Sequence, residues 1–332
     1  MSVSADVFRL PLLPSVRDLL KLYNVKATKR LSQNFLLDPK ITNKIVKIAN
    51  IRNCHVCEVG PGPGPITRAL LNRGCVSLTV IEKDPRFIPV LEQLVEAADG
   101  RMSVIMGDIL SYNMGALFDQ NLAVPWESEE IPQLRIVGNL PFNVATPLLI
   151  KWLECISNRS NAWSYGRIPM TLTFQKEVAE RIVAQIGDHQ RSRLSVICQY
   201  LCHVSHRFTI PGKAFVPAPD VDVGVVKFLP RVEPLIKLPF PLVEKVVRET
   251  FNTKNKIMFN CLRNLFPEPN RKQMVTEALN MADISPASRP IFLDVEEFGR
   301  ICYAYKKLCD RDPKLFEYDY RSPRKEEGGN DL

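Results

Sequence analysis

The chain has 332 residues, of which 45% are hydrophobic and 24% are charged, so it can bury a core and is neither fibrous nor wholly disordered. Its length predicts two domains, and it contains no run of about 18 apolar residues that could span a membrane. The 44 basic and 36 acidic residues give a net charge of +8, which favours an anionic partner such as nucleic acid.

The N-terminal segment, residues 1–27, is rich in basic side chains and poor in acidic ones. Residues 15–22 within it are predicted to form a short basic amphipathic helix. This pattern is typical of a mitochondrial targeting segment. An N-terminal arm that packs on the following domain is an equally good interpretation, and the sequence does not decide between the two.

Helices and strands are predicted to alternate from Asp38 onward. Asp38 and Pro39 are suited to begin a helix, as N-cap and first helical residue. Strands are predicted at 55–58, 77–82, 102–106, 135–138 and 170–174, and helices at 65–73, 87–97, 147–155 and 176–184. Such alternation indicates an α/β fold with a parallel, doubly wound, Rossmann-like sheet.

The chain changes character after a last predicted strand at 221–228. Helical patterns then dominate, including 242–251 and 294–307, where Asp294 and Glu297 have the spacing of a capping box. We therefore predict an α/β domain over 28–230 and a small all-helical, RNA-binding domain over 231–320. The charged segment 321–332 is predicted to be disordered.

A glycine-rich turn, Glu58-Val59-Gly60-Pro61-Gly62-Pro63-Gly64, follows the first predicted strand. Alternate glycines let a backbone approach a ligand closely. The spacing differs from the pyrophosphate-binding G-x-G-x-x-G, and the Glu58 carboxylate would repel a phosphate. It suits a ligand with a cationic amine, such as S-adenosylmethionine. Taken alone, the turn is equally consistent with a tight strand–helix connection.

Two further acids follow the next two predicted strands. Glu82 ends one strand and is placed to accept hydrogen bonds from both hydroxyl groups of a ribose. Asp108 follows the other and could accept from an adenine amine while Ile109 packs on the ring. Either acid alone is most often a solvated loop charge. Because successive parallel strands end at one crevice, three acids at three strand ends indicate a shared site.

The tetrapeptide Asn139-Leu140-Pro141-Phe142 ends the fourth predicted strand. The exocyclic amine of a base is a poor nucleophile because its lone pair is delocalised into the ring. The Asn139 side-chain oxygen and the Leu140 carbonyl could accept its N–H groups and localise that lone pair, with Pro141 fixing the turn. Phe142 could stack on the base and favour the charge that develops on nitrogen. The alternative is a proline turn with a buried Phe.

These motifs together resemble the rRNA adenine dimethyltransferase family. The matching segments are 31–36, 58–64, 80–83, 107–108, 139–142, 175–179 and 214–219, in the family's order. Residues 173–181 and 10–22 most resemble the animal mitochondrial member of the family. Seven ordered motifs argue against a chance similarity.

The resemblance implies N6,N6-dimethylation of two adjacent adenines in a small-subunit rRNA hairpin, with S-adenosylmethionine as methyl donor. Phe142 and Phe215 would sandwich the target adenine. The resemblance also implies the mitochondrial matrix, the assembling small ribosomal subunit as partner, and a monomer outside the membrane. The implied residues of the donor site are Gln33, Asn34, Leu36, Glu58, Gly60, Gly62, Glu82, Lys83, Asp108, Ile109 and Asn139.

Two alternatives stay open. One is a non-catalytic nucleic-acid-binding protein on the same fold, associated with mitochondrial transcription machinery; the intact strand-end motifs favour the enzyme. The other is a DNA adenine methyltransferase, which shares the tetrapeptide chemistry but must flip its target base out of a duplex. Candidate contacts with the phosphates of the RNA are Lys29, Arg30, Arg181, Arg191, Arg193, Lys213, Arg248, Lys254, Lys256 and Arg263.

Two groups of residues have spacings close to those of zinc ligands. They are Cys54-His55-Val56-Cys57, and Cys198 with Cys202, His203 and His206. Both lie in segments that read as strand or buried helix, where four preorganised ligands are not expected. We therefore predict no metal site.

Overall fold

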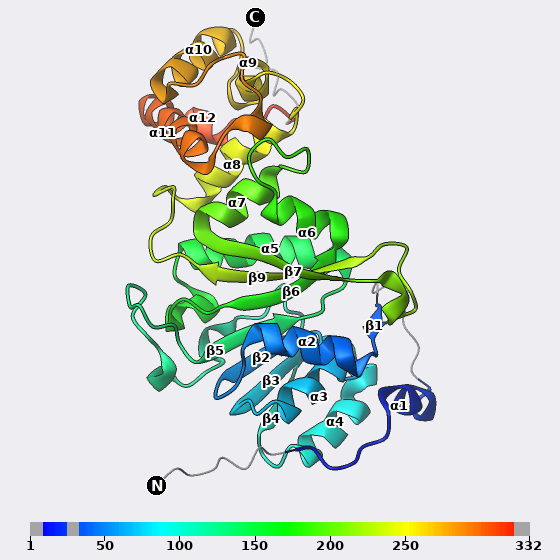
Figure 1. Ribbon diagram of the computed structural model, residues 1–332. Coiled ribbons are helices and arrows are strands. Elements are labelled where there is room, and N and C mark those ends of the chain that lie inside the picture. The colour runs from blue at the N-terminus through cyan, green and yellow to red at the C-terminus, as the bar shows by residue number, and fades with distance from the viewer. Residues whose placement is uncertain (1–8, 25–32, 322–332) are drawn as a thin grey trace, which may run out of the picture. The chain divides into compact units, whose positions relative to one another are not determined.

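The computed structural model describes residues 9–24 and 33–321 (Figure 1). The predicted disorder of the last residues and the candidate contacts Lys29 and Arg30 lie outside the described residues. Within them the chain divides into two compact units, one running to Val183 and including Leu201–Pro234, the other made of Ala184–Tyr200 and the chain from Leu235 onward. No helix in the described ranges is long and apolar enough to cross a membrane.

The first unit contains a seven-stranded sheet in the order β4-β3-β2-β5-β6-β9-β7. The five strands from β4 to β6 are parallel, which confirms the predicted Rossmann-like sheet. β9 pairs with β6, and β7 with β9, in antiparallel fashion. The strands are β2 (His55–Val59), β3 (Ser77–Glu82), β4 (Met102–Met106), β5 (Leu134–Gly138), β6 (Met170–Gln175), β7 (Cys202–Ile210) and β9 (Val223–Pro230).

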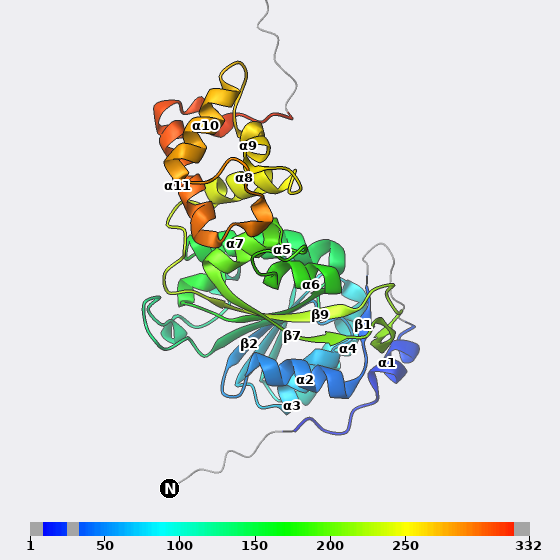
Figure 2. The ribbon, with the colours of Figure 1, turned by 45° about the horizontal axis from the view of Figure 1, so that its top comes forward.

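Helices cover both faces of this sheet (Figures 1 and 2). On one face lie α2 (Pro39–Ala49), α3 (Pro65–Asn72) and α4 (Ile88–Ala97), and on the other α5 (Phe142–Ser157) and α6 (Lys176–Val183). Asp38 caps α2 as predicted, because its carboxylate accepts from the Lys40 N–H at 2.8 Å. α5 begins at Phe142 rather than at Pro147, which lies inside the helix. The tetrapeptide therefore leads directly from β5 into α5.

Two segments outside the sheet complete the first unit. The predicted N-terminal helix is present as α1 (Val16–Leu22), with Ser15 as its N-cap. β1 (Phe35–Leu36) pairs antiparallel with β8 (Phe215–Val216), so that Leu36 lies opposite Phe215. This short ribbon joins the N-terminal motif to the segment that carries Phe215, two parts of the chain that are far apart in sequence.

The second unit is helical, as predicted for the C-terminal part of the chain. Asp294 and Glu297 form the predicted capping box at the start of α11, with hydrogen bonds of 2.7 and 2.8 Å. α11 packs against α8 and α10. The unit contains α7 (Arg193–Leu201) except for its last residue, followed by α8 (Phe240–Phe251), α9 (Met258–Cys261), α10 (Arg271–Ala282), α11 (Val295–Arg311) and α12 (Lys314–Glu317).

Candidate active site

A cavity of about 700 Å³ lies at the carboxyl ends of β2, β3 and β5 in the first unit. Its volume is within the range of small-molecule sites, roughly 300–1,000 Å³. Nearly all residues predicted for the site line it: Gln33, Asn34, Glu58, Gly60, Gly62, Glu82, Lys83, Asp108, Ile109, Asn139, Leu140, Pro141, Phe142 and Phe215. Leu36 does not line the cavity, because its side chain is fully buried in the hydrophobic core beside it.

The glycine-rich turn forms one wall of the cavity and is tied to the end of β3. Gly60 and Gly62 have φ values of +68° and +54°, which favour glycine over residues with a Cβ. The Gly62 N–H donates to Glu82 at 3.0 Å, and the N–H groups of Lys83 and Asp84 donate to the same carboxylate at 2.8 Å each. Glu82 is therefore held in one position, which suits it to accept from a ligand.

Glu58 lies deeper, at the end of β2, and is 1% exposed. The Thr67 hydroxyl of α3 donates to its carboxyl group at 2.6 Å. Burial raises the pKa of Glu58 to about 8, although this hydrogen bond opposes the shift. The group is thus mostly protonated at neutral pH. The expected attraction to a cationic amine then requires the ligand to displace the Glu58 proton.

The raised pKa of Glu58 predicts a pH-dependent stability. The native protein keeps a proton that the unfolded chain releases near the ordinary value of 4.5. Stability from this group is therefore lost as pH rises from about 4.5 to about 8. Glu58→Gln keeps the acceptor for Thr67 and has no proton to lose, so its stability relative to the wild type should improve with pH across this window. Thermal melts between pH 5 and 9 measure this; parallel curves would contradict it.

Asp108 and Asp84 are each paired with a cation at the rim of the cavity. Lys83 lies 2.7 Å from Asp108, and its hydrogen bond lowers the pKa of that carboxyl group. Arg86 lies 2.5 Å from Asp84 and lowers the pKa of Asp84 in the same way. Asp84 also accepts from the Gln33 amide at 2.8 Å, so the Gln33 side chain is tied to the protein.

The charges of the lining discriminate between kinds of ligand. Four carboxyl groups line the cavity: Glu58, which is mostly protonated, Glu82, and Asp84 and Asp108, which are paired with the two lining cations Arg86 and Lys83. Such a lining disfavours phosphates and fits a ligand that carries positive charge and donates hydrogen bonds. S-adenosylmethionine, with a sulfonium, an amine and a ribose, has this character.

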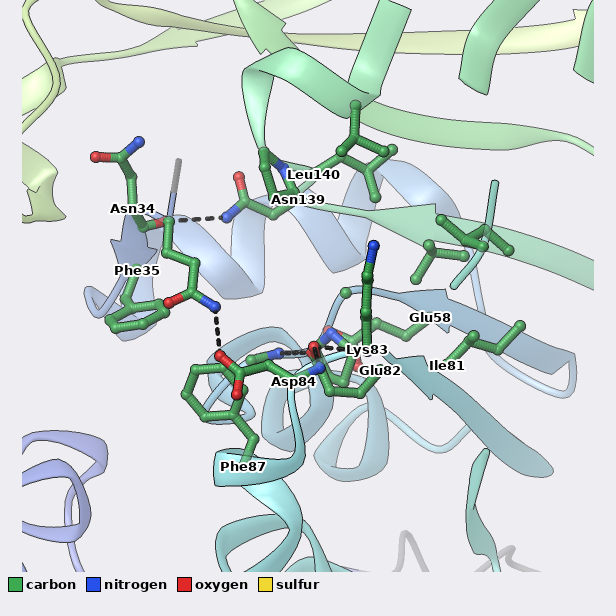
Figure 3. A pocket seen from close by; sticks show the side chains of 18 of the residues that line it. Asn34, Phe35, Glu58, Ile81, Glu82, Lys83, Asp84, Phe87, Asn139 and Leu140 are labelled. Atoms are coloured by element: carbon green, nitrogen blue, oxygen red, sulfur yellow. Dashed lines mark hydrogen bonds between the residues drawn. The ribbon is translucent and has the colours of Figure 1, made fainter. Parts of the chain in front are cut away.

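Asn139 faces Asn34 across the mouth of the cavity (Figure 3). Its amide nitrogen donates to the Asn34 carbonyl at 3.4 Å, and its amide oxygen accepts from the Thr173 hydroxyl at 2.8 Å. An amide oxygen has two lone pairs, so one remains for a further donor. The side chain is thus held at both ends and can still accept a hydrogen bond from a ligand.

Aromatic rings form the apolar part of the cavity. Phe142 and Phe215 line it as predicted, and Phe215 is 3% exposed on β8. Phe35 and Phe87 were not predicted as site residues, but they also line the cavity, and their rings pack edge-to-face with centroids 5.6 Å apart. Single aromatic residues on short elements have no periodicity that could have marked them. Thr67 and Thr173 were missed for a related reason: each acts through a contact that only the fold creates.

One candidate phosphate contact is wrong. Arg191 is 1% exposed, and its guanidinium donates to the carbonyls of Leu293 and Ala184 inside the second unit. A fully buried arginine that satisfies backbone acceptors is structural. Two others, Arg193 and Arg248, form ion pairs with Glu244, which reduces their availability to a phosphate.

The fold and this strand-end site define a Rossmann-like, S-adenosylmethionine-dependent methyltransferase. Residues 24–297 match the family model described as ribosomal RNA adenine dimethylase. The chain therefore belongs to the ribosomal RNA adenine dimethylase family and is an enzyme of that family.

Relatives extend over almost the whole chain. The chain is 53% identical over 314 residues to "Dimethyladenosine transferase 1, mitochondrial" of Macaca fascicularis, covering 94% of this chain and 91% of the relative. The Homo sapiens protein of the same name is 52% identical over 318 residues, covering 96% and 92%. A solved dimethyladenosine transferase from Plasmodium falciparum has the same fold, with a TM-score of 0.63 and 24% identity over 81% of this chain and 96% of that one.

Proposed function

We propose that the protein dimethylates N6 of two adjacent adenines in a hairpin of the small-subunit rRNA of mitochondria and thereby supports assembly of that subunit. S-adenosylmethionine would supply each methyl group: the N6 lone pair forms the new N–C bond, the C–S electron pair stays on sulfur, and the N6 proton is released. Family membership and the mitochondrial names of the relatives support this substrate and the mitochondrial matrix as its location.

The observation that carries the proposal is the meeting of the tetrapeptide with the acids at one cavity. Glu82 would hold the ribose of the methyl donor, and Asp108 would hold its adenine. The protein backbone at Gly60 and Gly62 would lie against the donor, and Ile109 would pack on its adenine ring. Asn139 and the Leu140 carbonyl would accept from the target amine. Phe142 and Phe215 would stack on the target base.

The proposal is tested with purified protein, methyl-labelled S-adenosylmethionine and a panel of small-subunit rRNA hairpins. Read at nucleotide resolution, two adjacent adenines of one hairpin should become dimethylated, and mass spectrometry should identify N6,N6-dimethyladenine. A product that stops at monomethyladenine, or methylation of duplex DNA in preference to every hairpin, would contradict it. The hairpin's affinity should also fall steeply with salt, because phosphate contacts release counterions.

A non-catalytic role in transcription is not proposed. The carboxylates of Glu82 and Asp108 and the clamped amide of Asn139 form an intact site in a chain that belongs to an enzyme family. The functions of the two predicted domains and of residues 1–27 stay predictions.

A further inference from the structure

The Asn139 carboxamide is held by a residue that lies outside the cavity. Thr173 is 1% exposed and is not among the residues that line the cavity, yet its hydroxyl lies 2.8 Å from the Asn139 oxygen. We infer that Thr173 is a positioning residue for methyl transfer: it fixes the orientation of the Asn139 amide so that an oxygen, and not an NH₂ group, faces the target amine. The inference rests on the proposed function.

The sheet register explains why Thr173 reaches Asn139. β5 and β6 are parallel, and Gly138 pairs with Leu172 as the last residue pair between them. The next residues, Asn139 and Thr173, therefore follow side by side where β5 ends. β6 continues to Gln175, and its pairing with β9 places Thr173 opposite Val225. Thr173 is thus held in the ladder by β9, one residue beyond the last pair with β5, and its β-branched side chain has few rotamers.

The two hydrogen-bond partners of the Asn139 side chain together determine where its amide oxygen and its NH₂ group point. The Asn34 backbone carbonyl can only accept, so the amide nitrogen must face it. The amide oxygen then faces Thr173, whose hydroxyl can donate. The contact to Asn34 is long, at 3.4 Å, and the contact to Thr173 is short, at 2.8 Å. The hydrogen bond to Thr173 is therefore the stronger of the two, while the acceptor-only carbonyl of Asn34 sets which end of the amide faces the threonine.

Without the Thr173 hydroxyl, the Asn139 amide would no longer be held in this orientation. The terminal torsion of asparagine is broad and nearly two-fold, so an amide without its anchor can turn over. A turned amide presents its NH₂ group to the amine of the base, where two donors face each other and no acceptor draws the N6 proton. The fraction of molecules with an oxygen in place would fall, and with it the rate of transfer. Binding of the methyl donor, which depends on the acids at the other strand ends, would not change.

The experiment compares Thr173→Val, which has nearly the same shape but no hydroxyl, with Thr173→Ser, which keeps the hydroxyl. Thr171→Val is the matched control, because Thr171 is 3% exposed and lies two residues earlier on the same strand. We expect Thr173→Val to lower kcat by about 10- to 100-fold, the usual effect of an unmade hydrogen bond at a buried acceptor. KM for the hairpin, and the calorimetric Kd for S-adenosylmethionine, should stay within about threefold of the wild type. Thr173→Ser and Thr171→Val should keep near-normal kcat.

A second readout does not depend on activity. With ¹⁵N-labelled asparagine, the side-chain NH₂ signals of Asn139 can be identified by their loss in Asn139→Ala, and they should shift or broaden in Thr173→Val but not in Thr171→Val. Wild-type kcat and unchanged Asn139 signals in Thr173→Val would overturn the inference, as would an equal loss in Thr171→Val. If Thr173→Val does not fold, Thr173→Ala supplies the same comparison. If the wild type methylates no hairpin, the proposed function fails, and the Asn139 signals still decide the inference.

Discussion

Asn139→Ala is expected to lower kcat for adenine methylation by about 10²- to 10³-fold, the effect of removing one preorganised polar group from a transition state. The substitution removes the amide oxygen, which in the wild type accepts from the Thr173 hydroxyl at 2.8 Å and keeps one lone pair for the target amine. Without that acceptor, the target amine keeps its lone pair in the ring system. Single-turnover methylation of the hairpin measures the loss.

The binding of the methyl donor should largely persist in Asn139→Ala, because Glu82 ends β3 and Asp108 lies in the loop after β4. Asn158→Ala is the matched control: Asn158 is exposed and caps the C-terminal end of α5, the helix that follows Asn139. It should behave as the wild type. Unchanged turnover of Asn139→Ala would refute the role assigned to this amide.

Glu82→Gln is expected to weaken the affinity for S-adenosylmethionine by about 10- to 100-fold, the range for hydrogen bonds to a charged group. The carboxylate accepts from three backbone N–H groups, those of Gly62, Lys83 and Asp84. An amide presents one oxygen and one NH₂ group, so at least one of these N–H groups would face a donor. The glycine-rich turn would lose a hydrogen bond to β3, and a ribose would lose a carboxyl oxygen as acceptor.

Isothermal titration calorimetry measures this change directly. Glu92→Gln, an exposed glutamate on α4, is the control and should bind the methyl donor normally. At a saturating concentration of methyl donor, the kcat of Glu82→Gln should be closer to the wild-type value than the kcat of Asn139→Ala. Wild-type affinity in Glu82→Gln would show that β3 does not contact the donor as proposed.

The sequence was sufficient to predict that the acids and the tetrapeptide share one site. Glu58 and Glu82 lie at the ends of strands with a clear apolar pattern and Asn139 directly follows another, and parallel strands end at the same edge. The antiparallel pairing of β9 and β7 was not predicted, because alternation of strands and helices says nothing about a strand that returns without a crossover helix.

Other features depended on contacts between distant parts of the chain. Arg191 was predicted as a candidate phosphate contact, but the second unit buries it against backbone carbonyls. Leu36 belongs to a motif whose neighbours line the cavity, yet in the β1–β8 pair its side chain turns into the core. Thr173 meets Asn139 only through the register of β5 and β6. Patterns in the sequence mark faces and strand ends, but they do not specify which side chains meet across them.

The most direct measurement is a crystal structure of the protein with S-adenosylmethionine and adenosine bound. The account predicts that N6 of the adenosine lies within hydrogen-bond distance of the Asn139 oxygen and the Leu140 carbonyl, with the methyl group of the sulfonium pointing at it. A methyl group directed away from Asn139, or a cavity mouth filled by the protein's own side chains in the ligand-bound state, would contradict the account.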